Sequence, residues 1–220
     1  KQFWKHINRP WSRKRIAEFA PTGYGLEIGC GTWTIAPASR TILSDAFASH
    51  AGNHSLARVF FDASNIPYPD RTFSFVLSEH VLEHVYDPIT TLKEWKRILC
   101  HKGKVFLFLP HKERMFDKDR KLTELSDLKK RLIEDSMIIK NDILDDWMEK
   151  VINPNLAEHY KKIEPRKMLS DGTIHYNVWK PKQILDLLCE VGFKVLFEED
   201  RVPDRPDSFL VIAQKNDQLA

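Results

Sequence analysis

The segment GLEIGCGTWT, residues 25–34, decides the fold because it joins an apolar strand to a glycine turn. Residues 24–28 form an apolar run typical of a buried strand. Gly29 and Gly31 follow, and glycine allows backbone conformations and close approaches that side chains forbid. Such a turn at the carboxyl end of a strand is where open α/β sheets bind nucleotide-like ligands. The segment therefore predicts an α/β sheet with a ligand site at this turn.

Strands and helices alternate along the chain. Two helices are expected to begin at Pro88 and Pro181, each with apolar residues at helical spacing and a glycine, Gly103 or Gly192, beyond it. Short runs rich in β-branched and aromatic residues predict the other strands. These runs cover residues 41–45, 57–62, 73–78, 104–109, 193–198 and 209–215. This order predicts a Rossmann-like, seven-stranded, mostly parallel sheet with one antiparallel strand.

Residues 111–175 differ in character from the rest. They are densely charged, and their apolar residues keep helical spacing in two runs, the second of which stops at Pro154. We expect a helical insertion after the fifth strand that caps the carboxyl edge of the sheet. A solvated helical appendage unrelated to the substrate is the alternative. The chain is expected to form one domain over residues 1–220, with this insertion as its cap.

Composition narrows the class of protein. The net charge of +3 is too small to indicate a nucleic-acid partner. No apolar run approaches the roughly 20 residues of a membrane helix, and no signal-peptide pattern opens the chain. Cys30, Cys100 and Cys189 are far apart and odd in number, which favours a reducing compartment over a disulfide framework or a zinc site. We therefore expect a cytoplasmic protein with no membrane span.

The first fifteen residues, KQFWKHINRPWSRKR, are basic and carry three aromatic residues, Phe3, Trp4 and Trp11. We expect an amphipathic segment that packs its aromatic rings against the sheet. An arm that binds phosphate or nucleic acid is the alternative.

The glycine turn lacks two common phosphate-binding motifs. A dinucleotide motif needs a third glycine where Thr34 stands, and a P-loop needs a lysine that does not follow Gly31. Instead, Asp45 closes the second strand and Asp62 closes the third. The first carboxylate can accept from both hydroxyls of a ribose, and the second from the amino group of adenine. An adenosine without a pyrophosphate fits this pattern better than a dinucleotide.

With these residues in order, the chain resembles the class I S-adenosylmethionine-dependent methyltransferases. The resemblance covers roughly residues 20–110 and is carried by GLEIGCG, DASNIPYPDRTFSFVLSEHVLEHV and RILCHKGKVFLFLPH. It is nearest to the small-molecule branch known as methyltransferase type 11. The segments LPHKERMFDKDRKLTELSDL and IHYNVWKP are similar to methyltransferases of bacterial cell-surface glycan assembly. The resemblance implies S-adenosyl-L-methionine as cofactor and S-adenosyl-L-homocysteine as product.

The resemblance also implies a cofactor-binding set. It comprises Glu27, Gly29, Cys30, Gly31, Asp45, Ala46, Asp62, Ala63, Ser78 and Glu79. The glycines would approach the methionine part of the cofactor, and Glu27 would anchor the turn or bind the amino group. Asp45 would hold the ribose, and Asp62 with the Ala63 amide would face the adenine. The end of the fourth strand, including His80, would lie beneath the sulfonium.

The chain departs from the family pattern at two points. Trp33 stands where the family often has a third glycine, and the segment before Thr41 is too short for a full first helix. The contact to the cofactor carboxylate is therefore open, and Trp33 can pack over the cofactor instead.

Three histidines are candidate catalytic residues. Methyl transfer is an in-line displacement in which positioning supplies much of the catalysis, but an alcohol acceptor also needs a base. His111, after the fifth strand, is the first choice, followed by His80 and His175. His84 is assigned to packing of a predicted helix. No carboxylates have convincing metal-ligand spacing, so no required metal is predicted, and whether a metal assists is left open.

The leading hypothesis is O-methylation of a sugar or glycan intermediate. One alternative is N- or C-methylation of another small metabolite. Another is a non-catalytic, cofactor-binding partner subunit, suggested by Trp33 and the shortened first helix. The identity of the acceptor and the oligomeric state are left open.

Overall fold

The computed structural model describes residues 8–50, 53–157, 160 and 162–216. Its main sheet has seven strands in the spatial order β5-β2-β1-β6-β7-β9-β8. Their bounds are Gly25–Ile28 (β1), Thr41–Asp45 (β2), Val59–Phe60 (β5), Phe73–Glu79 (β6), Leu99–Pro110 (β7), Phe193–Glu199 (β8) and Ser208–Lys215 (β9). Pairs from β5 to β7 are parallel, while β9 is antiparallel to both β7 and β8. The predicted seven-stranded sheet with one antiparallel member is confirmed.

The strand order reverses between β1 and β6, which lie side by side at the centre of the sheet. Crossovers from β1 lead outward to β2 and β5, and the chain then returns to β6 on the other side. The connections therefore diverge above the carboxyl ends of β1 and β6. Such a switch point leaves a crevice in which open α/β sheets bind ligands.

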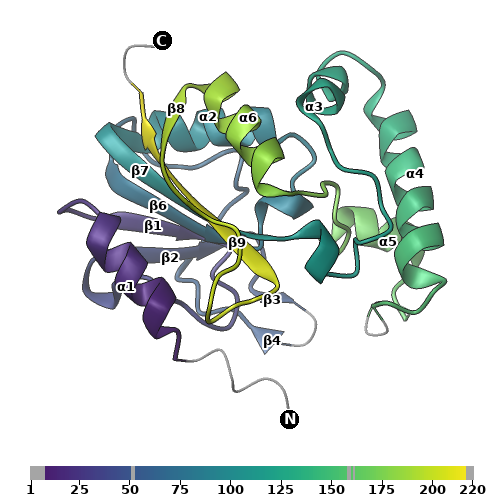
Figure 1. Cartoon of the computed structure of the whole chain (residues 1–220), viewed down its shortest axis with the longest axis horizontal. Coiled ribbons are helices and arrows are strands. Elements are labelled where there is room, and N and C mark those ends of the chain that lie inside the picture. The colour runs from purple at the N-terminus through teal and green to yellow at the C-terminus, as the bar shows by residue number, and fades with distance from the viewer. Residues whose placement is uncertain (1–7, 51–52, 158–159, 161, 217–220) are drawn as a thin grey trace.

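Helices cover both faces of the sheet (Figure 1). On one face lies α1 (Pro10–Phe19), and on the other lie α2 (Pro88–Ile98) and α6 (Pro181–Val191). Because side chains alternate along a strand, each face has its own apolar core. Around α1 the core includes Ile16, Phe75, Leu77, Phe106, Phe108, Leu210 and Ile212. Around α2 and α6 it includes Leu26, Val76, Leu92, Trp95, Val105, Leu107, Ile184 and Leu188.

The caps of α2 and α6 follow the sequence signals. The Asp87 carboxylate accepts a hydrogen bond of 3.0 Å from the Thr90 amide, which satisfies an otherwise unpaired donor at the start of α2. Gly192 ends α6 in the left-handed conformation, with φ of 83°. The helix α2 ends at Ile98, although Leu99 continues its apolar spacing. Leu99 instead begins β7 and pairs with Phe73.

Residues 111–175 form a helical insertion beside the carboxyl edge of the sheet (Figure 1). It contains α3 (Leu125–Arg131), α4 (Ser136–Trp147), α5 (Pro165–Ser170), a 3-10 turn η4 (Lys112–Arg114) and a π-helical turn η5 (Met148–Ile152). Its apolar residues form a separate small core around the fully buried Trp147. The Arg131 guanidinium donates to the Tyr86 and Tyr176 carbonyls, at 2.8 and 3.0 Å, and so ties α3 to the rest of the protein.

Some local expectations agree with the structure, and others differ from it. The segment between the glycine turn and β2 has only a three-residue 3-10 turn, η2 (Ala38–Arg40), which confirms that no full helix fits there. A two-stranded hairpin, β3 (Ser49–His50) with β4 (Asn53–His54), was not predicted. The helix expected to contain His84 is instead a separate 3-10 turn, η3 (Leu82–His84), before α2. No helix in the described part of the chain combines the length and apolarity needed to cross a membrane.

The basic N-terminal segment packs against the sheet where it is described. Trp11 packs against the core beneath α1, and its ring centroid lies 6.5 Å from that of Phe197. Arg9 is fully buried and donates to the Glu79 carboxylate at the end of β6. The packing prediction is therefore confirmed for Trp11. Phe3 and Trp4 lie outside the described residues.

We predict that Arg9→Met lowers the free energy of unfolding by about 1.5–3 kcal/mol, because it removes a charge-assisted hydrogen bond to the buried Glu79 carboxylate, which keeps Arg205 as a partner. The control is Glu18→Gln, which removes an exposed ion pair with Arg15 on the same helix and should cost at most about 1 kcal/mol. Urea denaturation of both variants measures the difference. Equal losses would show that the Arg9 contact is no stronger than a surface pair.

Candidate active site

A cavity of about 920 Å³ lies at the carboxyl ends of β1, β2 and β6 and extends beneath the insertion. One part is lined by the glycine turn and strand ends, with Glu27, Gly29, Cys30, Gly31, Trp33, Asp45, Ala46, Asp62, Ala63 and Glu79. The other part is lined by His80, His84, Tyr86, Met115, Phe116, Lys140, Tyr160, His175 and Tyr176. The insertion therefore forms one wall of the cavity.

The glycine turn is held in a conformation that requires glycine. Gly29 and Gly31 have φ of +69° and +54°, in the left-handed region. A Cβ at Gly29 would lie only 2.2 Å from a Val81 methyl, whereas one at Gly31 would meet nothing within 4 Å. Gly29 and Cys30 donate their amides to the Ser44 carbonyl at 2.9 and 3.0 Å, which binds the turn to β2. The open space at Gly31 lets a ligand approach the backbone there.

Asp45 organises the loop beside this turn. One carboxylate oxygen accepts from the Gly31 amide at 3.0 Å and from the Ser55 hydroxyl at 2.9 Å. The other accepts from the Ala46 amide at 2.8 Å. These donors hold the carboxylate at the cavity wall. A ligand hydroxyl that donates to this oxygen would take the place of the Ser55 hydroxyl, so one hydroxyl donor would be exchanged for another.

The loop after β5 supplies a second carboxylate. One oxygen of Asp62 accepts from the Ser64 amide at 2.7 Å and from its hydroxyl at 2.5 Å. The Trp95 indole of α2 donates to the Ala63 carbonyl at 2.9 Å and fixes the loop from the core side. Of the ten residues expected to bind cofactor, all but Ser78 line the cavity. Ser78 is buried in the sheet and does not line the cavity.

Glu27 is a buried carboxyl group beneath the turn, 2% exposed. It accepts a hydrogen bond from the Thr34 hydroxyl, a contact that ties the turn to β1. Burial raises the pKa of Glu27 to about 8, because the charged form is poorly solvated there; the Thr34 bond opposes the rise and the charge of Glu79 adds to it.

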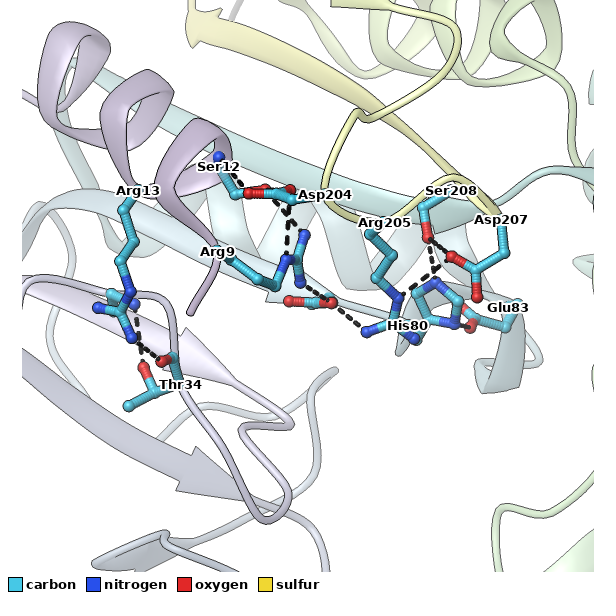
Figure 2. Close-up of polar contacts among 12 residues, drawn as sticks. Arg9, Ser12, Arg13, Thr34, His80, Glu83, Asp204, Arg205, Asp207 and Ser208 are labelled. Atoms are coloured by element: carbon cyan, nitrogen blue, oxygen red, sulfur yellow. Dashed lines mark hydrogen bonds and ion pairs between the residues drawn. The ribbon is translucent and has the colours of Figure 1, made fainter. Parts of the chain in front are cut away.

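Glu79 is the next carboxylate along the cavity and, unlike Glu27, is paired with two guanidinium groups. Arg9 from the start of α1 and Arg205 from the β8–β9 connection both donate to the same oxygen (Figure 2). Arg9 also reaches Asp204 at 3.5 Å, and Asp204 accepts from the Ser12 hydroxyl at 2.6 Å. The Arg205 guanidinium lies 5.9 Å from the centre of the Trp33 ring, so this network also positions the tryptophan at the cavity.

His80 follows β6 in a strained conformation. Its φ is +54°, which is uncommon for a residue with a side chain and is seen often at functional sites. Its Nε2 lies 2.7 Å from the Ser208 hydroxyl, and its Nδ1 lies 3.6 Å from a Glu83 carboxylate oxygen (Figure 2). Burial, and then the charge of Arg205, lower the pKa of His80 well below its usual value.

His175 and His84 meet on the insertion side of the cavity. Their ring centroids are 4.7 Å apart, with the rings nearly perpendicular. His175 Nδ1 bonds an Asp117 oxygen at 2.7 Å, and His84 Nδ1 bonds the Ile174 carbonyl at 3.0 Å. Because both partners are acceptors, both Nδ1 atoms carry the hydrogen, and each neutral ring keeps its lone pair on Nε2.

Asp117 is itself held by a buried cation. The Arg120 guanidinium donates to Asp117 at 2.9 Å and to Asp146 of α4 at 2.7 Å. Although burial alone would raise the pKa of Asp117, the charges and hydrogen bonds of His175 and Arg120 lower it. Sequence reasoning missed Asp117, Glu83 and His84. The repeated Glu-His pair in EHVLEH was the available signal, but the expected helix directed His84 toward packing.

His111 does not line the cavity, contrary to our first choice of catalytic histidine. Its Nδ1 accepts from the Glu113 amide at 3.2 Å, and its Nε2 lies 3.5 Å from Asp200. Its ring packs edge-on against Phe209. The bend after Pro110 turns this side chain toward the β8–β9 connection, away from the cavity. His80 and His175 do line the cavity, as expected of candidates.

Comparison with known proteins gives matches over part of the chain. Residues 26–107 match the family described as a methyltransferase domain. An uncharacterized protein of Methanocaldococcus jannaschii is 33% identical over 91 residues, covering 40% of this chain and 44% of that protein. A demethylmenaquinone methyltransferase of Bacillus licheniformis is 30% identical over 107 residues, covering 41% of this chain and 46% of that protein. The match thus spans less than half the length of these curated relatives.

Solved structures share the whole fold. An S-adenosylmethionine-dependent methyltransferase from Mesorhizobium loti has a TM-score of 0.55 at 15% identity, covering 93% of this chain and 96% of that one. A putative methyltransferase from Haloferax volcanii, in complex with the Trm112 activator, has a TM-score of 0.57 at 12% identity, covering 94% and 90%. The fold is therefore one that S-adenosylmethionine-dependent methyltransferases share, and residues 26–107 carry the match to a methyltransferase domain.

We predict a pH-dependent stability difference between wild type and Glu27→Gln. The raised folded-state pKa means that Glu27 stabilises the fold below pH about 4.5 and loses that contribution as the pH rises to about 8. The glutamine stays neutral and still accepts from Thr34, so the variant should gain on wild type by a few kcal/mol across this range, since each pKa unit is worth about 1.4 kcal/mol. Urea denaturation at pH 5, 6.5 and 8 measures it. A constant difference would place the pKa of Glu27 near its ordinary value.

Proposed function

We propose that this protein transfers a methyl group from S-adenosylmethionine to a hydroxyl oxygen of a sugar or glycan intermediate. The observation that carries the proposal is one continuous cavity with two chemically different parts. The glycine turn and strand-end carboxylates line one part, which we call the cofactor part. A histidine cluster lines the other, which we call the acceptor part. When bound, the cofactor supplies an electrophilic methyl group on a sulfonium sulfur.

The cofactor part has the donors and acceptors that the molecule needs. The open space at Gly31 leaves room for the methionine portion against the backbone. Asp45 would accept from the ribose hydroxyls, with exchange of the Ser55 bond. The Asp62 loop would face the adenine. Glu27 would ionise on meeting the amino group of the cofactor, because a nearby cation favours its charged form.

The acceptor part has the groups that a hydroxyl requires. An un-ionised alcohol is a poor nucleophile, so its proton must be removed as its oxygen bonds to the methyl carbon and the carbon–sulfur bond breaks. The Nε2 lone pairs of His84 and His175 are oriented by bonds on the opposite ring nitrogens. A basic group thus lies in the same cavity as the cofactor part. Lys140 and the tyrosines of this wall add polar contacts for a hydroxyl-rich molecule.

Methylation of carbon or nitrogen is the second candidate activity. The demethylmenaquinone methyltransferase of B. licheniformis is one of the relatives, and its name denotes a quinone-type acceptor. Phe116, Tyr86 and Tyr176 would provide apolar contacts for an aromatic acceptor. The H. volcanii complex also suggests the third candidate, a methyltransferase-fold subunit that works with a partner. An acceptor screen that includes sugars, phenols, quinols and amines separates these candidates.

The first test is isothermal titration calorimetry with S-adenosylmethionine and S-adenosylhomocysteine. We expect micromolar binding of both and at least tenfold weaker binding by Asp45→Ala, because a charge-assisted hydrogen bond is worth about 1.5–3 kcal/mol. Asp70→Ala is the control, since that exposed carboxylate pairs with Arg97 and does not line the cavity. Absence of binding by the folded wild type would reject the proposed activity.

A second test separates chemistry from cofactor binding. His175→Gln should lower the rate of S-adenosylhomocysteine formation by about 100-fold or more, with the best acceptor from the screen, because it removes an oriented basic nitrogen. Cofactor affinity should stay within about threefold of wild type. His111→Ala is the matched control and should keep most of the activity, because that ring faces away from the cavity. Parallel losses of rate and cofactor affinity in His175→Gln would assign it a structural role.

A further inference from the structure

Glu83 is the buried group that the proposed reaction does not use. Its side chain is fully buried in η3, yet neither carboxylate oxygen accepts a hydrogen bond from any described residue. Its near neighbours are imidazoles: His80 Nδ1 at 3.6 Å and His84 Nε2 at 3.9 Å. A buried carboxylate with both oxygens unsatisfied is costly, and such a group in a native fold needs an explanation.

Two imidazoles complete a set of ligand atoms around this carboxylate. Glu83, His84 and His175 each offer one ligand atom, and these atoms lie within 4.8 Å of one another. We propose that Glu83, His84 and His175 bind one divalent transition-metal ion, of the zinc type, at the wall of the acceptor part of the cavity, which His84 and His175 line and behind which Glu83 is buried. Two imidazoles and one carboxylate are a common ligand set for catalytic zinc, which leaves a position for water or substrate.

The surrounding residues are those that a metal site requires. A ligating histidine usually donates its other ring hydrogen to a carboxylate or a backbone carbonyl, which fixes the tautomer and the ring orientation. His175 does so to Asp117, and His84 does so to the Ile174 carbonyl. Asp117 is held in turn by the buried Arg120. His84 Nε2 lies 3.9 Å from a Glu83 oxygen, and the bond from His175 Nδ1 to Asp117 leaves Nε2 as the ligand atom of His175.

The donor set selects the kind of ion. Magnesium and calcium prefer oxygen ligands, whereas imidazole nitrogen suits zinc, iron, copper and nickel. The charge of one carboxylate and two neutral rings also leaves a net positive charge when a divalent ion binds. That charge would favour an anionic oxygen as the next ligand.

The site extends the proposed function and rests on it for its role. A metal ion lowers the pKa of a bound oxygen ligand, to about 7 in the case of zinc-bound water. A bound acceptor hydroxyl would likewise lose its proton to solvent near neutral pH, and the histidines would act as ligands and not as the base. The expectation from sequence that no metal is required would then be replaced.

The experiment titrates Zn²⁺ into chelator-treated protein and measures binding by calorimetry. We expect one ion per chain with micromolar or tighter affinity, and no measurable competition by millimolar Mg²⁺. Glu83→Gln and His84→Gln should abolish this binding. Asp117→Asn, which keeps all three ligands, should weaken it by about 10- to 100-fold. The control His54→Gln, an exposed histidine on β4, should bind as wild type does.

Thermal unfolding supplies a second readout. Zn²⁺ should raise the Tm of wild type and leave that of Glu83→Gln unchanged; without zinc, the neutral variant should be at least as stable as wild type. Should Glu83→Gln fail to fold, His84→Gln and Asp117→Asn carry the test.

Absence of zinc binding by wild type, or equal affinities in wild type and the Glu83 and His84 variants, would overturn the site. S-adenosylmethionine binding is measured on the same samples. Cofactor binding without zinc binding therefore rejects the metal site alone, and zinc binding without cofactor binding rejects the proposed activity alone.

Discussion

Three buried carboxyl groups at the carboxyl edge of the sheet, Glu27, Glu79 and Glu83, impose the electrostatic constraint on which the site depends. A carboxylate removed from water must be protonated, paired or coordinated. The partners of the three groups differ. Glu27 has a raised pKa and a hydroxyl partner, and Glu79 has two guanidinium partners. Burial also raises the pKa of Glu83, to about 7, and its carboxylate lies beside the imidazoles of His80 and His84; a metal ion is the partner that we propose for it.

The pairing of Glu79 explains why segments far apart in sequence converge on this edge. Arg9 brings the start of α1 to the end of β6, and Arg205 brings the β8–β9 connection to the same oxygen (Figure 2). Arg205 then lies over Trp33, which stands in the glycine turn. A buried ion pair of this kind adds little stability over an apolar packing but is costly to break. It therefore serves mainly to fix the position of the cavity walls.

A second buried network holds the insertion. Arg120 links Asp117 to Asp146 of α4, and Asp117 orients His175. The helix α4 is thus coupled to a ring that lines the cavity. The histidine keeps a defined tautomer because its partner is an acceptor. The same arrangement suits a proton acceptor and a metal ligand, and the zinc titration distinguishes the two.

The sequence by itself determined the sheet, its one antiparallel strand and most of the cofactor part of the cavity. These follow from local signals: a glycine turn after an apolar strand, carboxylates at strand ends, and proline and glycine at helix ends. They are reliable because strand ends of a parallel sheet meet at one edge. Asp45 and Asp62 reach the cavity for this reason, whereas Ser78 does not, since alternation along β6 buries its side chain in the sheet.

Only the tertiary structure decided the acceptor part. His84 and His175 are 91 positions apart, and no periodicity relates them; the insertion must fold back before their rings meet. The orientation of His111 depends on the bend after β7, which spacing along the chain does not encode. Likewise, Arg9 and Arg205 are recognised as partners only when Glu79 lies between them. Contacts of high sequence separation arise from packing, and packing is what a single sequence does not display.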